Sequence, residues 1–255
     1  MIHSAHALVA FTTRLGRPTG VKDETVQICP IRLKGFLKCF LLKGRRAVLV
    51  DTGSTGDGRR IRDMLPHHGV RLTDLALIVI THAHPGHAGG LFYLKERLEV
   101  PVAVHRLDAD ALRQGSNRTF SATCGLGRLL CPLLPRGVGY AGVEPDIVID
   151  DEFDLSPYNV AGKAISTPGH TPGALSVILD SGEAIVGDLV VGGMIRRRRP
   201  YVSAFADDKM QVLASIQKLL DQQVQTIHSA HGGPFGAEVV RRQLLEKAAG
   251  KSDHF

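Results

Sequence analysis

The chain of 255 residues carries a net charge of +6, with 44% hydrophobic and 22% charged residues. These fractions are those of an ordinary soluble globular protein. No apolar run approaches the ~20 residues that a membrane helix needs, and the N-terminus lacks the basic start and long apolar stretch of a signal peptide. We therefore expect a cytoplasmic protein that has no membrane partner.

The excess positive charge is concentrated in Arg196 to Arg199, with further arginine pairs scattered along the chain. No aromatic residues interleave with these runs, as a surface that binds single-stranded nucleic acid would require. We therefore do not expect nucleic acid as a partner. Two interpretations stay open, namely a solvated basic face and a surface that attracts an anionic small-molecule substrate.

The first half of the chain predicts a strand meander followed by alternating strands and helices. Short β-rich runs at 26–31, 36–43 and 46–51 are separated by turn residues. A helix is expected at 58–68, ended by Gly69. The run LALIVI at 75–80 is typical of a strand buried on both faces. A helix at 91–98, a strand at 102–105 and an irregular insertion with helical pieces at about 109–142, rich in Gly, Pro, Arg and Cys, complete this half.

The second half repeats this order of a meander and then alternation. Strands are expected at 146–150, 159–166, 174–180, 183–188 and 224–230, and helices at 207–220 and 237–248. No stretch resembles a linker. The pattern predicts one domain over residues 1–255 of the α/β class, a four-layer αββα sandwich in which two mixed β-sheets are flanked by helices.

The stretch THAHPGHAGG (81–90) places His82, His84 and His87 within six positions. In extended backbone, residues i and i+2 project to the same side, so His82 and His84 can approach one ion. Pro85 holds His84 out of the helical region. His87 falls at the start of the next helix and is turned toward a different point. This spacing favours two neighbouring metal positions.

Three later stretches have the same character, because in each a polar residue follows an apolar strand. TPGHTPG (167–173) contains His170, IVGD (185–188) ends with Asp188, and SAHGGP (229–234) contains His231. Loops at strand ends are where binding and catalytic residues collect. Taken together, these residues extend the histidine cluster into one candidate metal centre.

The sequence here resembles the metallo-β-lactamase superfamily. That family's signature T-H-x-H-x-D-H is followed by a Pro-Gly-flanked His, an Asp after a G-D step and a His in an H-G-x-P turn. Its early D-T-G turn is also present, as 51–53. The resemblance covers the chain from about residue 26 to residue 231 and implies the αββα fold.

The resemblance also implies a role for each matching residue. His82, His84 and His170 are implied to bind a first metal ion, and His87 and His231 a second. Asp188 is implied to bridge both ions, and Asp51 to orient a ligand histidine. The implied ion is Zn²⁺, with Fe or Mn as alternatives.

Gly86 departs from the family pattern, because it stands where the family's motif has an aspartate that ligates the second metal. We expect the second ion to be held weakly, with water in the open ligand position. In the alternative, a carboxylate from elsewhere, such as Asp207 or Asp208, takes that position.

These features predict a metal-dependent hydrolase. Zn²⁺ lowers the pKa of bound water to ~7, so that metal-bound hydroxide can attack an ester, lactone, thioester, amide or phosphoester of a small molecule. Without the motif aspartate, Asp188 or solvent must accept the proton. Arg196 and Arg197 are candidates to pair with a substrate carboxylate or phosphate, and Tyr201 to donate to a developing oxyanion.

Three alternatives are weighed against this prediction. VLVDTGS (48–54) resembles the active-site turn of aspartic proteases, but those enzymes need two such carboxylates and no second D-T-G is present. An iron-dependent oxygenase acting on a small thiol or persulfide keeps the fold and uses one redox metal. A catalytically weak member of the fold that acts as a binding module is the third.

Overall fold

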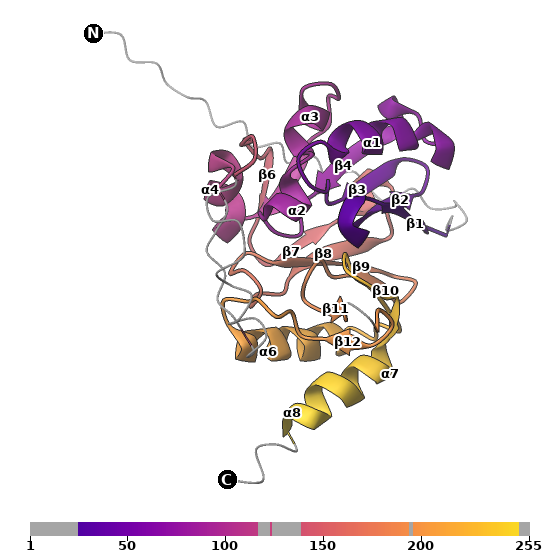
Figure 1. The fold of residues 1–255 in the computed structure, drawn as a ribbon. Coiled ribbons are helices and arrows are strands. Elements are labelled where there is room, and N and C mark those ends of the chain that lie inside the picture. The colour runs from indigo at the N-terminus through magenta and orange to yellow at the C-terminus, as the bar shows by residue number, and fades with distance from the viewer. Residues whose placement is uncertain (1–24, 117–122, 124–138, 194–195, 250–255) are drawn as a thin grey trace.

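The computed structural model describes residues 25–116, 123, 139–193 and 196–249. Within these residues two six-stranded sheets lie face to face, and helices cover the outer face of each sheet (Figure 1). The chain up to residue 149 builds the first sheet with its helices, and the chain after it builds the second. The predicted αββα sandwich of two mixed sheets is confirmed.

The first sheet has the strand order β1-β2-β3-β4-β5-β6. Its first three strands pair antiparallel and its last four pair parallel, and the parallel neighbours are joined by helical crossovers, as parallel pairing requires. The strands are β1 (Gln27–Arg32), β2 (Lys38–Lys43), β3 (Ala47–Val50), β4 (Leu75–Val79), β5 (Val102–His105) and β6 (Ile147–Ile149). The helices are α1 (Asp57–Met64), α2 (Pro85–Ala88), α3 (Leu91–Lys95) and α4 (Arg106–Gln114), with short 3-10 helices at Lys34–Phe36, Pro66–His68 and Leu72–Asp74.

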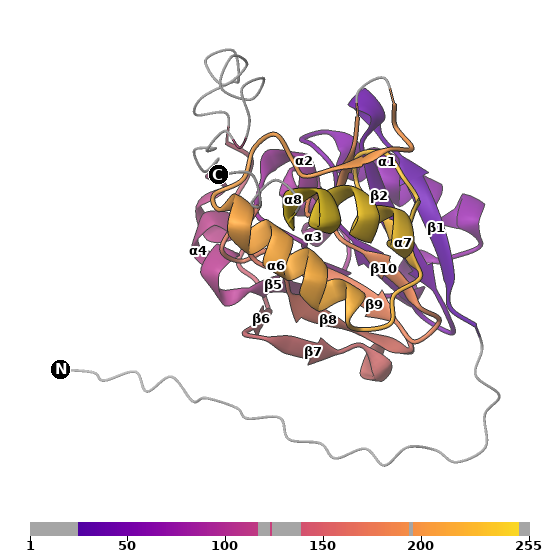
Figure 2. The ribbon, with the colours of Figure 1, turned by 90° about the horizontal axis from the view of Figure 1, so that it is seen from below.

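The second sheet has the order β14-β13-β10-β9-β8-β7, in which β10 and β13 pair parallel. Its strands are β7 (Glu152–Asp154), β8 (Gly162–Ser166), β9 (Leu175–Leu179), β10 (Glu183–Ile185), β13 (Thr226–His228) and β14 (Phe235–Gly236), with a 3-10 helix at Ser156–Tyr158. A separate hairpin joins β11 (Val191–Gly192) to β12 (Pro200–Tyr201). Two helices cross the outer face side by side (Figure 2). They are α6 (Lys209–Leu220) and a C-terminal helix made of α7 (Ala237–Val240), a π-helical segment (Arg241–Glu246) and α8 (Lys247–Ala249).

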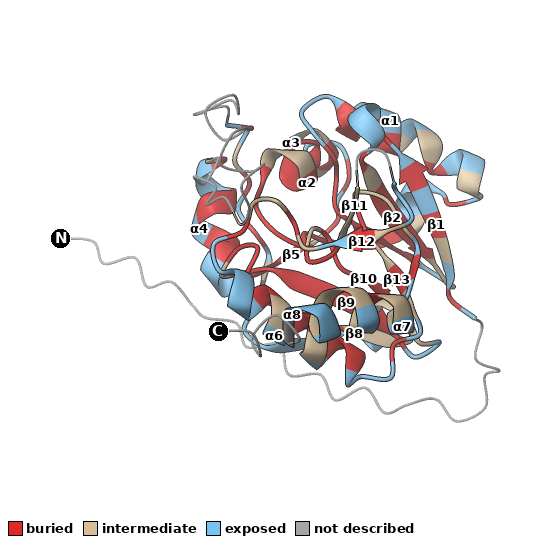
Figure 3. Ribbon diagram, turned by 60° about the horizontal axis from the view of Figure 1, so that its bottom comes forward, coloured by how far each residue is buried: buried red, intermediate tan, exposed pale blue. Residues whose placement is uncertain are grey.

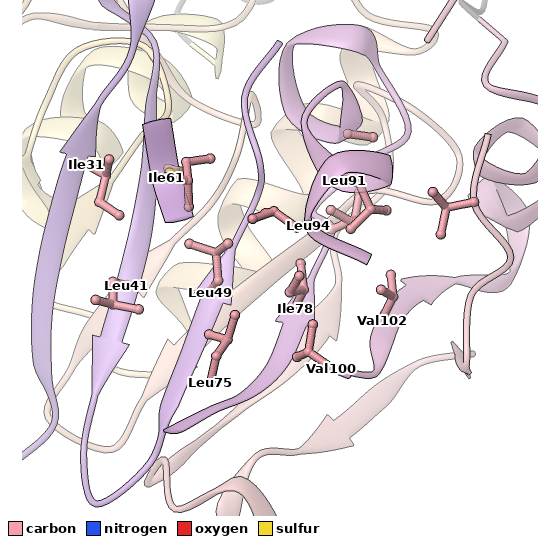
Figure 4. Packing of buried hydrophobic residues seen from close by; sticks show 14 of the residues in the cluster. Ile31, Leu41, Leu49, Ile61, Leu75, Ile78, Leu91, Leu94, Val100 and Val102 are labelled. Atoms are coloured by element: carbon pink, nitrogen blue, oxygen red, sulfur yellow. The ribbon is translucent and has the colours of Figure 1, made fainter. Parts of the chain in front are cut away.

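Side chains that alternate along the strands fill three separate cores between the four layers. In β2, Cys39 and Leu41 face the first helical layer, whereas Phe40 and Leu42 face the second sheet. Figure 4 shows the first of these cores, where Leu41, Leu49 and Ile78 of the sheet pack beneath Ile61 of α1 and Leu91 and Leu94 of α3. Burying each such side chain fully contributes roughly 1.5–3 kcal/mol to stability.

Burial follows this layering throughout the described residues. The central strands β2 to β5, β9 and β10 are almost wholly buried, whereas the edge strands β1 and β7 and the outer helices expose one face (Figure 3). Every residue of β4 is buried, as the LALIVI run predicts. No helix in the described part of the chain is long and apolar enough to span a membrane.

Most differences from the predicted elements lie at element ends. The strand predicted at 159–166 begins only at Gly162, because Asn159 adopts a positive φ of 60° that ends the preceding turn. The strand predicted at 183–188 stops at Ile185, two residues before Gly187 with its φ of 52°. The helix predicted at 58–68 changes to a 3-10 helix at Pro66, and Gly69 ends it as predicted.

A few elements were not predicted at all. They are the short strands β7 and β14 and the hairpin β11–β12. Of the helical pieces predicted within the insertion at 109–142, the structure shows α4, which begins earlier than predicted, at Arg106. Most of that insertion, at 117–122 and 124–138, lies outside the described residues.

Candidate metal centre

The predicted ligand residues lie in four loops, each of which follows a strand. His82 and His84 follow β4, His170 lies between β8 and β9, Asp188 follows β10, and His231 follows β13. The ends of strands from both sheets therefore meet at one edge of the sandwich.

Backbone contacts hold the two sheets together at this edge. The amide of Leu175 donates to the carbonyl of Thr81 at 2.8 Å, which links β9 to the loop after β4. An isolated antiparallel bridge pairs Leu37, before β2, with His231. The loop after β4 is thus bonded to the start of β9, and the loop of His231 is bonded to the segment before β2.

The first group of candidate ligand atoms belongs to three buried histidines. One ring nitrogen from each of His82, His84 and His170 lies within 4.8 Å of the other two. The Nδ1 of His84 is 3.1 Å from the Nε2 of His170. His84 has an extended backbone, with φ −89° and ψ 153°, as the following Pro85 predicts. The carbonyl of Phe205, 2.9 Å from the Nδ1 of His170, fixes that ring.

The second group shares His82 and adds His87 and Asp188, again with ligand atoms within 4.8 Å of one another. The Oδ1 of Asp188 lies 3.5 Å from the Nε2 of His87 and 3.7 Å from that of His231, and its Oδ2 lies 3.8 Å from the Nε2 of His170. Asp188 therefore stands between the two groups, where a bridging carboxylate would stand. His231 stands at the rim, with its side chain 42% exposed.

Two buried polar atoms of this cluster fit a cation. Among the described residues, the Nε2 of His82 and the Oδ1 of Asp188 are buried and make no hydrogen bond. An unpaired buried polar atom is costly, and a metal ion would pair both of these atoms at once. Imidazole nitrogens with a carboxylate oxygen are donors that Zn²⁺, Fe and Mn all accept.

The protonation states in the cluster also suit metal binding. Burial, together with the neighbouring histidine charges, holds the pKa of His82 well below its usual value, and burial likewise lowers the pKa of His170. Burial raises the pKa of Asp188, but the charges of His231 and His87 outweigh it and hold this pKa well below the usual value. His82 and His170 are therefore neutral imidazoles beside an ionised Asp188, which are the forms that bind a metal.

His87 is the exception, because two carboxylates face it. Burial alone would lower the pKa of His87, but the charges of Asp51 and Asp188 raise it to about 10. The Oδ2 of Asp51 is 2.7 Å from the Nδ1 of His87. Asp51 also accepts hydrogen bonds from the amide and hydroxyl of Thr81, at 2.8 and 2.9 Å. With Nδ1 held in this way, the Nε2 of His87 points toward Asp188.

Gly86 lies in α2, and its φ is outside the left-handed region. A Cβ added there would meet only the Cδ2 of Leu37, at an ordinary contact distance of 3.9 Å. The backbone therefore does not require glycine at this position. Of the two alternative carboxylates, Asp208 is engaged elsewhere, since its Oδ1 caps α6 by accepting from the amides of Met210 and Gln211. Asp207 lies beside His170, to whose carbonyl its amide donates at 3.3 Å.

A buried carboxylate that the sequence analysis missed ties the two loops of the first group together. Asp108 of α4 is fully buried, and it accepts from the amide of Ala83, the hydroxyl of Thr171 and the amide of Gly173, at 2.8, 3.1 and 3.1 Å. Ala83 lies between His82 and His84, and Thr171 follows His170. The available signal was an aspartate among apolar residues in LDADAL (107–112).

The candidate substrate residues lie in the β11–β12 hairpin, beside His231. The amide of Gly192 donates to the carbonyl of His231 at 2.5 Å, and the amide of Gly233 donates to the carbonyl of Arg197 at 3.1 Å. Arg196 and Arg197 are exposed at the turn of this hairpin, and Tyr201 in β12 is 37% exposed. Their contact with a substrate stays a prediction.

Comparisons with known proteins agree with this arrangement. A family model described as the metallo-beta-lactamase superfamily matches residues 35–231. The chain is 28% identical over 218 residues to the probable metallo-hydrolase YqgX of Bacillus subtilis (strain 168), covering 84% of this chain and 91% of that protein. It is 28% identical over 169 residues to a Bos taurus protein named acyl-coenzyme A thioesterase MBLAC2, covering 64% and 58% of the two chains.

Among solved structures, the BLEG-1 B3 metallo-beta-lactamase shares the fold with a TM-score of 0.64 at 19% identity, covering 86% of this chain and 99% of that one. The family match spans well over half of the chain and ends on the last histidine of the cluster. The chain belongs to the metallo-β-lactamase superfamily.

Proposed function

We propose that this protein is a metal-dependent hydrolase whose metal centre is built by His82, His84, His170 and Asp188, with His87 and His231 completing a weaker second position. The observation that carries the proposal is the pair of overlapping ligand groups that share His82. The buried Nε2 of His82 and Oδ1 of Asp188 support it, because neither atom makes a hydrogen bond within the described residues.

When bound, a Zn²⁺-type ion supplies hydroxide at neutral pH and polarises the bond to be cleaved. The protein's residues hold the ion and handle the proton. Asp188 is ionised and lies between the two ligand groups, so it is the carboxylate that can accept a proton from the attacking water. Gly86 contributes no carboxylate, which leaves Asp188 and solvent to share this task.

The shape of the second position supports an asymmetric centre. Two protein atoms, the Nε2 of His87 and the Oδ1 of Asp188, lie 3.5 Å apart, and the ring of His231 is partly exposed at the rim. An ion held there has fewer buried ligands than one held by the three buried histidines. We infer one tightly bound ion and one that exchanges with solvent.

For the substrate, we propose a small-molecule carboxylic ester or thioester. The similarity to a protein named acyl-coenzyme A thioesterase supports a thioester in particular. The exposed arginines of the β11–β12 hairpin support an anionic substrate, because they carry positive charge beside the turn of His231. The backbone of Arg197 is hydrogen-bonded to that turn.

The test combines metal analysis with a substrate panel on the purified full chain. We expect one to two zinc ions per chain and hydrolysis of an acyl thioester that is lost on chelation and restored by zinc. One iron per chain with thiol-dependent oxygen consumption would instead indicate the oxygenase. A metal-free protein that hydrolyses no ester, lactone or thioester and regains nothing with added zinc, iron or manganese would overturn the proposal in favour of a binding module.

A further inference from the structure

A basic groove of about 790 Å³ lies between the β11–β12 hairpin and the C-terminal helix. It is lined by Arg196, Arg197, Arg198, Arg199, Gln243 and Lys247. The strand β12 packs against the π-helical segment that carries Gln243, so the two walls are in contact at their base. The groove is wide open to solvent, so a ligand there would be held by charge and not by enclosure.

The arginines of this groove keep their charge available. No ion pair within the described residues joins any of the five cationic side chains to a carboxylate, whereas Arg71, Arg106 and Arg113 elsewhere are each paired. Five uncompensated cations around one groove repel one another, so a bound polyanion would relieve that repulsion.

The hairpin also holds the arginines in position. The amide of Arg199 donates to the carbonyl of Arg196 at 2.9 Å, which closes a turn with Arg197 and Arg198 at its corners. The guanidinium of Arg197 lies 3.5 Å from the ring centroid of Phe36, and that of Arg199 lies 5.5 Å from that of Tyr201. Stacking engages the flat face of a guanidinium and leaves its N–H edge free to bind an anion.

The hairpin that carries the arginines of this groove is joined by backbone hydrogen bonds to the turn that carries His231. The carbonyl of Arg197 accepts a hydrogen bond from the amide of Gly233, two residues after His231. The amide of Gly192, at the base of the hairpin, donates to the carbonyl of His231 itself. These hydrogen bonds place the arginine turn beside the loop of one predicted ligand histidine.

We propose that this groove binds the phosphorylated end of the substrate, with at least two phosphoryl charges, while the ester or thioester end reaches the metal centre. The inference rests on the proposed function for the identity of the reactive end, and on the groove alone for the phosphate. Guanidinium pairs bind phosphate oxygens bidentately, which suits several arginines on one turn better than a single carboxylate would. No aromatic ring is among the described residues that line the groove, so it offers no platform for stacked bases, which argues against single-stranded nucleic acid.

The first experiment measures binding of adenosine 3′,5′-bisphosphate to the metal-loaded protein by calorimetry. The test variant is Arg198→Ala with Lys247→Ala, since both residues are exposed and neither is one of the stacked arginines. The matched control is Arg45→Ala with Arg46→Ala, which removes the same charge from the exposed turn between β2 and β3. We expect Kd to rise about tenfold or more in the test variant and less than about twofold in the control.

The outcomes separate the groove from other sites. Binding that is equally tight in the test variant, as it would be if the bisphosphate sat on the metal, would overturn the proposal. So would the absence of binding by the wild type. Tighter binding of a single-stranded oligouridylate than of the bisphosphate, lost in the same variant, would assign the groove to nucleic acid instead.

A second experiment separates the groove from the proposed hydrolysis. An acyl-coenzyme A and the N-acetylcysteamine thioester of the same acyl group share the reactive bond and differ in the phosphorylated portion. We expect the test variant to raise KM for the first by about tenfold, with kcat and the neutral thioester unaffected. If the wild type hydrolyses the neutral thioester as efficiently as the phosphorylated one, the proposal for the groove is wrong while the proposed function stands. If neither is hydrolysed, the proposed function fails while the bisphosphate binding still decides the groove.

Discussion

His170 and His231 hold corresponding places in the second sheet, each in a loop after a strand, yet their surroundings differ. The side chain of His170 is 3% exposed, and its Nδ1 is fixed by the carbonyl of Phe205. The side chain of His231 is 42% exposed, although its backbone is anchored by Ser229 and by the hairpin. The ring of His170 is therefore fixed by a hydrogen bond within the protein, whereas the ring of His231 is partly exposed to solvent.

The same contrast runs through the two ligand groups. His82, His84 and His170 form a buried set of three nitrogens whose loops are joined by Asp108. The second group depends on Asp188 and His87, and Gly86 offers no side chain where the family motif has a carboxylate. A preorganised site binds more tightly because less ordering is lost on binding. The same edge of the fold thus carries a buried group of candidate ligands beside a group with an exposed histidine at its rim.

The strongest test of this comparison removes the buried His170 of the first group and, separately, His231, which stands at the rim beside the second group. We expect His170→Ala to lower bound metal to below half of the wild-type content and hydrolysis by more than about 100-fold, because it removes a buried ligand rather than an outer partner. His231→Ala, at the rim, is expected to lower hydrolysis by only about tenfold and to leave the tightly bound ion in place. Metal content after dialysis and thioester turnover measure both. Equal metal loss in the two variants would show that both histidines contribute equally to metal binding, and the contrast would be wrong.

A sharper test changes the residue that orients a ligand instead of the ligand. Asp51→Asn keeps the size of the side chain but removes the charge that faces the Nδ1 of His87. We expect the affinity for the second ion to fall by about 10–100-fold with the first ion retained. Asp108→Asn is the matched control, because it alters the loops of the first group and does not contact His87. Zinc titration of the two variants after chelation gives both affinities, and a loss confined to the first ion in Asp51→Asn would contradict the assignment.

Much of the fold could be predicted because it depends on local periodicity. The LALIVI run is buried on both faces, and Pro85 and Gly69 act on the backbone as their chemistry requires. The ligand cluster could be found because short-range spacing places His82 and His84 together. The meeting of four loops depends on how two sheets stack, which spacing alone does not encode.

The elements that were missed depend on contacts distant in sequence. Asp108 is explained only by Thr171 and Gly173, more than sixty residues away. The hairpin β11–β12 has two residues in each strand, too few for alternation to be recognised, and it is stabilised by the His231 turn. The strand ends differ from the predicted ones because turn residues such as Asn159 adopt a positive φ, which a β-rich sequence pattern does not reveal.

The test with the smallest expected effect adds a carboxylate beside the second ligand group. Gly86→Asp introduces the carboxylate that the family motif has, and the structure removes the steric objection, since the new Cβ meets only Leu37 at 3.9 Å and φ is not left-handed. We expect the affinity for the second zinc ion to rise about tenfold, which is the scale of one added charge-assisted contact. Gly86→Asn is the control for shape without charge and should leave that affinity within about twofold. Titration of the chelated proteins with zinc decides the matter. A wild type that already binds two ions tightly, with no gain in Gly86→Asp, would mean that another group, such as the neighbouring Asp207, completes the second site, and the contrast between the two groups would be lost.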